Sequence, residues 1–178
     1  MNLKMILTSE NVSNEILNNL DYLLTIIPEI KPMIGFNQKH PHHNLDVFMH
    51  TLEALKNSKN DYIIRLALLF HDIGKIGVPD AISQKNGKLD DDEYSQIKQH
   101  PNIGVHILSH AKIFKNIINE VCYLVKYHDT PITKEDVEKN YNLQLKRYEV
   151  QRCDTLAHNP LMNSKRISYL IKTKKLFK

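Results

Sequence analysis

The sequence has little that would indicate a disulfide scaffold, a membrane span or an export signal. Its cysteines are Cys122 and Cys153, too few for a disulfide framework, so reduced core thiols are the simplest expectation. No apolar run approaches the roughly 18 residues of a membrane span. The first residues contain too short an apolar segment for a signal peptide and turn polar at once. We therefore expect a cytoplasmic protein that makes no membrane contact.

Glycine is also scarce, with five residues in 178, and the alternation typical of strands is weak. Apolar residues make up 42% of the chain and charged residues 25%, as in an ordinary soluble protein, so global disorder is not expected. Apolar side chains recur at helical spacing along the chain instead. These features predict an all-α fold, with residues 1–178 forming a single domain, a core at about 28–160 and a basic C-terminal helix at about 161–178.

The expected helices follow this periodicity and the turn residues between them. Acidic residues at 90–93 favour a helix start, and Thr133 with Asp136 has the spacing of a capping box. Pro28 should end the first helix. We expect helices over residues 10–27, 44–56, 60–72, 91–99, 101–109, 112–128, 134–158 and 161–175, with an irregular stretch after 72.

The stretch "LALLFHDIGK" at residues 66–75 is the most informative part of the chain. Tyr62 to Phe70 is apolar except for Arg65, which predicts a helix buried on nearly all sides. His71 and Asp72 follow directly, and a carboxylate at the end of a core helix is costly unless a positive charge neutralises it. A bound divalent metal would supply that charge.

Further histidines and an aspartate lie on other predicted helices and could complete such a site. Imidazole and carboxylate groups together suit first-row divalent metals. Each residue alone is weak evidence, because a single helical histidine is more often a surface or hydrogen-bonded residue, and Asp154 alone could pair with Arg152 or Lys146. The candidate ligands are His50, His71, Asp72, His100, His128 and Asp154.

The order His, His-Asp and Asp along the chain resembles the signature of the HD superfamily of metal-dependent phosphohydrolases. The segments "PEIKPMIGFNQKHPHHNLDVFMHTLEAL", "LVKYHDTPIT" and "KRYEVQRCDTLAHNP" resemble the HD domain of bacterial CCA-adding tRNA nucleotidyltransferases. The centre, "HDIGKIGVPDAISQKNGKLDDDEYSQIKQHPNIGVHIL", is similar to the HD-GYP cyclic-dinucleotide phosphodiesterases. Together these matches cover most of residues 28–160 and imply an HD-type helical bundle.

The chain departs from both branches. No nucleotidyltransferase domain precedes the HD region, so CCA addition is not expected of this chain. After His128 the HD-GYP pattern continues with His, Glu and then Gly-Tyr-Pro, whereas this sequence has Asp129, Thr130 and Pro131 and no Gly-Tyr-Pro. Hydrolysis of cyclic di-GMP thereby loses its main support.

The resemblance implies a metal centre of one or two divalent ions, chosen from Mn, Fe, Co, Ni, Mg or Zn. His50, His71, Asp72 and Asp154 would hold a first ion. His100 and His128 would hold a second, with Asp72 bridging; otherwise these two histidines would face substrate or solvent. A metal-activated water would then attack phosphorus.

Five other residues are candidates for catalysis or substrate binding. Lys75 could steady a phosphate or be a solvated lysine, and Asp129 could take a leaving-group proton or be a turn residue. His43 matches a histidine of the CCA-type pattern and could line the pocket. Arg152 could bind phosphate or pair with a nearby acid, and His158 could contact substrate, although a surface position is the commoner case.

The sequence therefore predicts a stand-alone phosphohydrolase that acts on a phosphomonoester or phosphodiester, such as a nucleotide or an RNA end. Two alternatives stay open. One is an RNA- or nucleotide-binding module with a structural or inactive metal site, in which the basic segment "KRISYLIKTKKLFK" at 165–178 is the contact surface. The other is a small regulatory domain that binds a partner protein. Neither the substrate nor the oligomeric state follows from the sequence.

Overall fold

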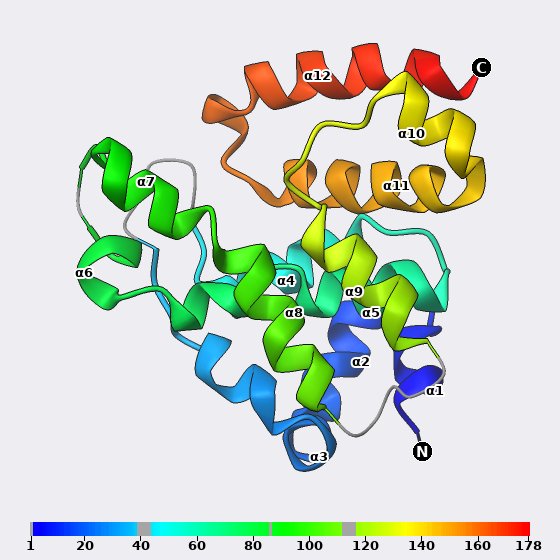
Figure 1. Ribbon diagram of the computed structural model, residues 1–178. Helices are drawn as coiled ribbons and strands as arrows, with labels where there is room; N and C mark the ends of the chain where they lie inside the picture. The colour runs from blue at the N-terminus through cyan, green and yellow to red at the C-terminus, as the bar shows by residue number, and fades with distance from the viewer. Residues whose placement is uncertain (1, 39–43, 86, 112–116) are drawn as a thin grey trace.

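The computed structural model describes residues 2–38, 44–85, 87–111 and 117–178, and within these ranges it is built from helices without a strand (Figure 1). The all-α prediction is confirmed. Asn37 and Asp46 form one isolated β-bridge. The α-helices are α1 Leu3–Leu7, α2 Val12–Asn18, α3 Leu20–Ile26, α4 Val47–Lys56, α5 Tyr62–Phe70, α6 Asp80–Ser83, α7 Asp91–Ile97, α8 His100–His110, α9 Ile118–Lys126, α10 Lys134–Lys139, α11 Tyr141–Ala157 and α12 Ser164–Lys174. Short 3₁₀ segments cover Pro28–Met33, Ile73–Gly77, Pro160–Met162 and Lys175–Phe177.

None of the described helices is both long enough and apolar enough to cross a membrane.

Two of the expected helices are wrong because an asparagine interrupts each of them. The segment 10–27 divides at Asn19, whose side-chain amide donates to the Glu15 carbonyl and so ends α2. The segment 134–158 divides at Asn140, whose side chain accepts a hydrogen bond from the Leu143 backbone N–H and starts α11. Such side chains compete with the backbone for hydrogen bonds, which favours helix ends. The capping box of Thr133 and Asp136 is confirmed.

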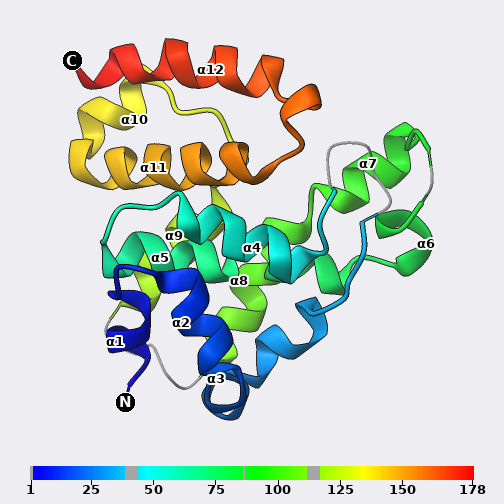
Figure 2. The same cartoon turned by 180° about the vertical axis from the view of Figure 1, so that it is seen from behind.

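Helix α5 lies at the centre of the molecule, with α4, α9 and α11 packed around it (Figures 1 and 2). Every residue from Ile64 to Phe70 is buried, as the apolar run predicted. Arg65 is buried there too, where its guanidinium donates hydrogen bonds to the backbone carbonyls of Leu7 and Ser9. His71 and Asp72 consequently enter the interior at the end of a fixed helix.

A smaller apolar cluster holds the C-terminal helix in place. Ile132, Val137, Tyr148 and Leu170 pack together, so that α12 lies along α11 and the 3₁₀ segment Lys175–Phe177 contacts α10 (Figure 1). The beginning of α12 is thereby brought next to the end of α11, where Asp154 lies.

Candidate metal centre

Three of the four predicted histidine ligands share one local arrangement at helix ends. The Nδ1 atom of His71 lies 2.7 Å from the Leu68 carbonyl, that of His100 lies 2.9 Å from the Ile97 carbonyl, and that of His128 lies 2.7 Å from the Val125 carbonyl. Each carbonyl belongs to the last turn of a helix and lacks an intrahelical partner of its own. Because a carbonyl can only accept, each Nδ1 carries the proton, and each Nε2 points into the interior.

Asp72 lies between two groups of these histidines. Its Oδ2 atom is 3.4 Å from His71 Nε2 and 3.7 Å from His50 Nε2. Its Oδ1 atom is 3.4 Å from His100 Nε2 and 3.7 Å from His128 Nε2. The two oxygens therefore face different imidazole pairs, which is the arrangement that a bridging carboxylate requires.

Asp154 completes the first group from the opposite helix. Its Oδ1 atom lies 2.9 Å from His50 Nε2 and 3.5 Å from His71 Nε2. His158, one turn further along the chain, lies with its Nδ1 atom 3.3 Å from the same oxygen. The described residues thus include three buried groups that could hold a metal ion: His50, His71 and Asp72; His50, Asp154 and His158; and Asp72, His100 and His128.

The donor atoms are suited to a cation. His71 Nε2 is buried without a hydrogen-bond partner. The Nε2 atoms of His100 and His128 are only 3.2 Å apart, although in the neutral rings both carry lone pairs because both Nδ1 atoms donate to carbonyls. Buried lone pairs that face one another repel unless a positive charge lies beside them. Imidazole nitrogens and carboxylate oxygens are ligands of divalent first-row metals, so these residues fit the expected ion.

The electrostatics indicate the same demand for positive charge. Burial raises the pKa of Asp72, but the charges of Lys75 and His71 outweigh this effect and hold that pKa well below its usual value. Burial also lowers the pKa of His71, but the neighbouring carboxylates of Asp72 and Asp154 outweigh it and raise the value to about 9. Burial lowers the pKa of His128, which keeps that ring neutral and able to bind a metal. The carboxylates therefore attract a cation to the Nε2 atoms.

Lys75 and Asp129, two of the candidate residues, lie at this cluster. Lys75 Nζ is 2.7 Å from Asp72 Oδ2. Asp129 Oδ2 is 3.7 Å from the Nε2 atoms of both His100 and His128, and its side chain is 40% exposed. Burial raises the pKa of Asp129, yet the charges of His128, His100 and Arg166 bring it below its usual value. Asp129 is therefore a carboxylate at neutral pH, suited to accept a proton or to contact a cation.

Three other predicted residues have different outcomes. His43 lies outside the described residues. Arg152 is not among the residues that line the cavity beside the cluster; its guanidinium lies 3.1 Å from Glu149 Oε2 and donates to the Asn57 carbonyl, so the structure shows the alternative of a neighbouring acid. The surface position expected for His158 is wrong, because its ring is buried against His50. Burial lowers the pKa of His158 to about 4.

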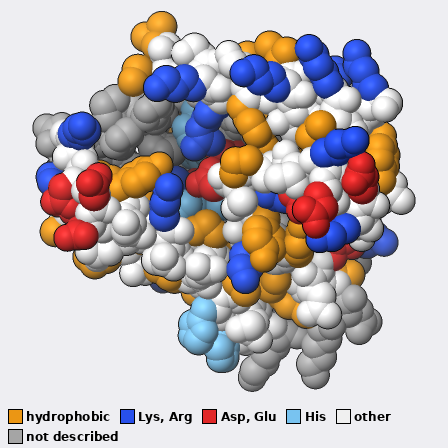
Figure 3. Space-filling model, turned by 45° about the horizontal axis from the view of Figure 1, so that its top comes forward, with side chains coloured by type: hydrophobic (Ala, Val, Ile, Leu, Met, Phe, Trp, Pro, Cys, Tyr) orange, Lys and Arg blue, Asp and Glu red, His pale blue; other side chains and the backbone are white. Residues whose placement is uncertain are grey.

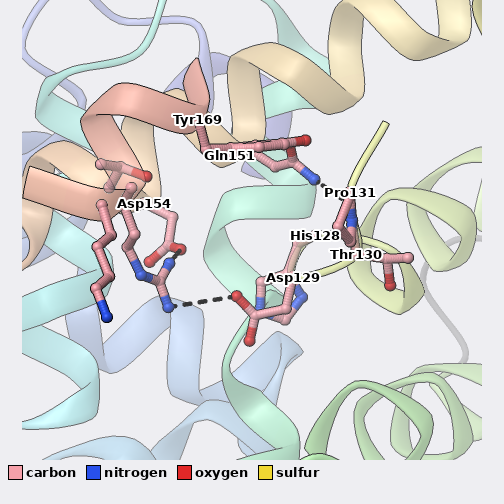
Figure 4. Close-up of a pocket in the computed structure, with 10 residues that line it drawn as sticks. His128, Asp129, Thr130, Pro131, Gln151, Asp154 and Tyr169 are labelled. Carbon is pink, nitrogen blue, oxygen red and sulfur yellow. Dashed lines mark hydrogen bonds and ion pairs between the residues drawn. The ribbon is translucent and has the colours of Figure 1, made fainter. Parts of the chain in front are cut away.

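Arg166, which was not among the candidates predicted from the sequence, reaches the cluster from α12. Its guanidinium contacts Asp154 and Asp129 in a cavity of about 290 Å³ (Figure 4). Figure 3 shows acidic and histidine side chains in a hollow beside Lys and Arg side chains. The basic composition of residues 165–178 was the available signal, but it did not indicate which residue turns inward.

Comparison with known proteins identifies the family. The family model described as HD domain matches residues 42–159, about two thirds of the chain, and this range contains every predicted metal ligand. The chain belongs to the HD domain family. The resemblance found from the sequence is therefore confirmed. No solved structure matches the chain.

Curated relatives resemble shorter stretches. The chain is 49% identical over 47 residues to the cyclic di-GMP phosphodiesterase response regulator RpfG of Xanthomonas campestris, covering 26% of this chain and 12% of that protein. It is 41% identical over 61 residues to the 3′3′-cGAMP-specific phosphodiesterase 2 of Vibrio cholerae, covering 34% and 12%. It is 34% identical over 67 residues to the multifunctional CCA protein of Legionella pneumophila, covering 35% and 16%. Each match thus spans less than a fifth of the relative's length.

Proposed function

We propose that the chain is a metal-dependent phosphohydrolase that cleaves a phosphomonoester or phosphodiester of a nucleotide or RNA end. The observation that carries this proposal is the position of Asp72, whose two carboxylate oxygens face two separate imidazole pairs at 3.4 to 3.7 Å. This arrangement supports a two-ion centre, a type of site that stabilises both the attacking and the leaving oxygen in phosphoester cleavage. Two of the relatives reported above are phosphodiesterases of cyclic dinucleotides, which supports the same reaction class.

In this proposal each buried residue has a defined part. A first ion would be held by His50, His71, Asp72 and Asp154, and a second by Asp72, His100 and His128. Divalent ions held there would acidify a water molecule and polarise the phosphate. Nickel, cobalt, iron, manganese and zinc all accept this mixture of imidazole and carboxylate, so the native metal is chosen by supply as well as by affinity.

Other side chains act on the substrate or on its protons. Lys75, whose ammonium group lies against Asp72, places positive charge at the cluster and would draw a phosphate oxygen toward it. Asp129 is ionised and partly exposed at the cluster, where it would accept a proton or orient the attacking water. His158 is neutral at physiological pH and would line the inner side of the site.

The test is hydrolysis of p-nitrophenyl phosphate and bis(p-nitrophenyl) phosphate with added Mn²⁺, Co²⁺, Ni²⁺, Mg²⁺ or Zn²⁺. We expect metal-dependent turnover that Asp72→Asn reduces by about 10³-fold or more, because the bridging charge is removed. Asp21→Ala, an exposed aspartate of α3, serves as the matched control and should keep full activity. The preferred ester then separates monoesterase from diesterase.

The competing function, an RNA- or nucleotide-binding module, gives a different result in the same assay. Such a module would bind Mn²⁺ in wild type and yet show the same background hydrolysis as Asp72→Asn. That outcome would contradict the phosphohydrolase, and a titration with single-stranded RNA would then measure the alternative.

A further inference from the structure

The cavity beside the cluster has one wall that contains none of the candidate metal ligands. It lies between the segment after α9, the end of α11 and the start of α12, and it encloses about 290 Å³ (Figure 4). His128, Asp129 and Asp154 line its inner side, while Lys165, Arg166 and Tyr169 line the side made by α12. This volume is at the lower end of the range for small-molecule sites, roughly 300–1,000 Å³. The cavity thus joins the metal ligands to the beginning of the basic helix.

Arg166 contacts the outer oxygens of two carboxylates in this cavity. Its Nη1 atom lies 3.0 Å from Asp154 Oδ2, and its Nη2 atom lies 3.5 Å from Asp129 Oδ1. The other oxygen of each carboxylate faces the histidines: Asp154 Oδ1 lies 2.9 Å from His50, and Asp129 Oδ2 lies 3.7 Å from His128. Arg166 and the imidazoles are therefore on opposite sides of these carboxylates, so the guanidinium can remain in place when the imidazoles bind ions.

The guanidinium has capacity for a further anion. It presents five N–H donors in a planar fork, and the arginine side chain is 39% exposed. Such a fork binds phosphate oxygens through two parallel hydrogen bonds. Because Arg166 already stands beside Asp154, a phosphate bound to it would also lie next to the predicted first ion.

Two uncharged polar side chains of the cavity wall, those of Tyr169 and Gln151, are occupied by hydrogen bonds within the protein. The Tyr169 hydroxyl donates to Gln151 Oε1 and accepts a hydrogen bond from the Ile132 backbone N–H. The Gln151 amide donates to the Thr130 carbonyl. Lys165, by contrast, is exposed and has no ion-pair partner within the described part of the chain. The two cations are thus the donors of α12 that can receive a ligand.

We propose that Arg166 and Lys165 form the anion-binding wall of the substrate cavity, with Arg166 on the scissile phosphate and Lys165 on a second anionic group of the same substrate. The inference rests on the proposed function and narrows it to phosphoesters that carry a second phosphate nearby, such as a nucleoside bisphosphate or the end of an oligonucleotide. It also divides the basic segment: its first two cations serve the cavity, and the later lysines do not.

The test measures binding directly by calorimetry, on the full chain loaded with Mn²⁺. The probes are inorganic phosphate, adenosine 3′-monophosphate and adenosine 3′,5′-bisphosphate. Arg166→Ala should weaken the binding of all three by about tenfold or more, as expected for loss of a charge-assisted bidentate contact. Lys165→Ala should weaken the binding of the bisphosphate by about tenfold and the binding of inorganic phosphate by less than about twofold. Lys172→Ala, an exposed lysine of the same helix, should change none of them.

Arg166→Lys is the control for misfolding, because it keeps a positive charge near both carboxylates and removes only the planar guanidinium. We expect it to retain the Mn²⁺ content and melting temperature of wild type and still to weaken phosphate binding by about fivefold. Equal phosphate affinity in wild type, Arg166→Lys and Arg166→Ala would overturn the proposal and leave Arg166 as a structural link between α12 and α11. If Lys165→Ala weakened the binding of the monophosphate and of the bisphosphate equally, the proposal that Lys165 binds a second anionic group would be overturned.

These experiments distinguish failure of the proposed hydrolase function from failure of the proposed anion-binding wall. A wild-type protein that binds phosphate through Arg166 but hydrolyses no ester would support the anion-binding wall and contradict the phosphohydrolase. A wild-type protein that hydrolyses esters with unchanged KM in Arg166→Lys and Arg166→Ala would support the hydrolase and contradict the wall.

Discussion

Gly74 lies in backbone contact with His100, the first residue of α8. A Cβ atom on Gly74 would overlap the His100 carbonyl oxygen and stand 2.6 Å from the backbone nitrogen of Gly104. Helix α8 can therefore approach the 3₁₀ segment Ile73–Gly77 only because residue 74 has no side chain. The same approach brings His100 within 3.4 Å of Asp72, so glycine at this position sets the spacing of the second ligand group.

Gly74→Ala should separate α8 from the Asp72 segment. We expect the free energy of unfolding to fall by about 3 kcal/mol, since the added methyl group meets backbone that cannot rotate away. Mn²⁺ binding should weaken as His100 moves from Asp72. Urea denaturation and a Mn²⁺ titration measure the two effects. Gly77→Ala is the control, because the three atoms nearest to its added Cβ would all belong to the Ile103 side chain, with no backbone atom among them; a similar loss in both variants would contradict this explanation.

Arg147 fixes the segment that carries His128 and Asp129. Its buried guanidinium donates to the carbonyls of Tyr127, Thr130 and Pro131. Arg147→Met should lower the free energy of unfolding by about 3 kcal/mol, because buried acceptors lose charged donors. Hydrolysis of bis(p-nitrophenyl) phosphate by the folded fraction should fall by about 10²-fold, since the ligand and the carboxylate lose their fixed positions.

Arg65 provides the matched control for that variant. It is also buried and also donates to backbone carbonyls, but to those of Leu7 and Ser9, which belong to α1 and the turn after it. Arg65→Met should destabilise the protein to a similar extent and leave turnover of the folded protein within about twofold of wild type. Equal losses of turnover in both variants would indicate a general effect of instability.

Metal removal should lower the melting temperature. An ion that binds the folded chain and not the unfolded one stabilises it by about 2.7 kcal/mol at 100 times its dissociation constant. For a chain of this length we expect a shift of roughly 5–10 °C between EDTA and saturating Mn²⁺. Thermal unfolding followed by circular dichroism measures it. Asp72→Asn should lose most of the shift, whereas Asp21→Ala should keep it.

Cys153 should react slowly in the folded protein at alkaline pH. Burial raises the pKa of its thiol from 9.0 to about 12. At pH 9 about half of an unfolded thiol is thiolate but only about one part in a thousand of the folded one, so alkylation by iodoacetamide should be about 500-fold slower than in urea. The variant Cys122→Ala leaves Cys153 as the thiol measured. The folded state favours the neutral thiol, so this contribution to stability is present below pH 9 and is lost as the pH rises through 12. Similar rates in the two states would contradict the burial of Cys153.

The sequence was sufficient for the parts of the site that follow from local pattern. The apolar run before His71 predicted a buried helix, and the order of His50, His71, Asp72 and Asp154 predicted the ligand set that the structure brings together. The pattern could single out these residues because they sit at or near the ends of strongly periodic helices, and their role as metal ligands stays a prediction. The departures at Asn19 and Asn140 arose where a polar side chain redirects hydrogen bonds without changing the apolar spacing.

Contacts between distant segments could not be predicted in this way. Arg166 is 12 residues beyond Asp154, and the chain reverses between them, so helical periodicity does not relate the two residues. For His158 a substrate contact was possible and a surface position the commoner case, but its ring is buried beside the His50 ring. In both cases the packing of α12 and α4 against α11 decides the environment, and a single sequence holds no signal for that packing.

Three imidazoles of the cluster are held by a backbone carbonyl at the end of the preceding helix. His71, His100 and His128 take their orientation from local backbone and owe little of it to the loops that join the helices. Insertions or deletions in those loops can therefore change the surroundings of the centre without changing the orientation of the imidazole nitrogen atoms. A chain of this design can acquire a new substrate by exchanging its loops and its last helix, without rebuilding the chemistry at its core.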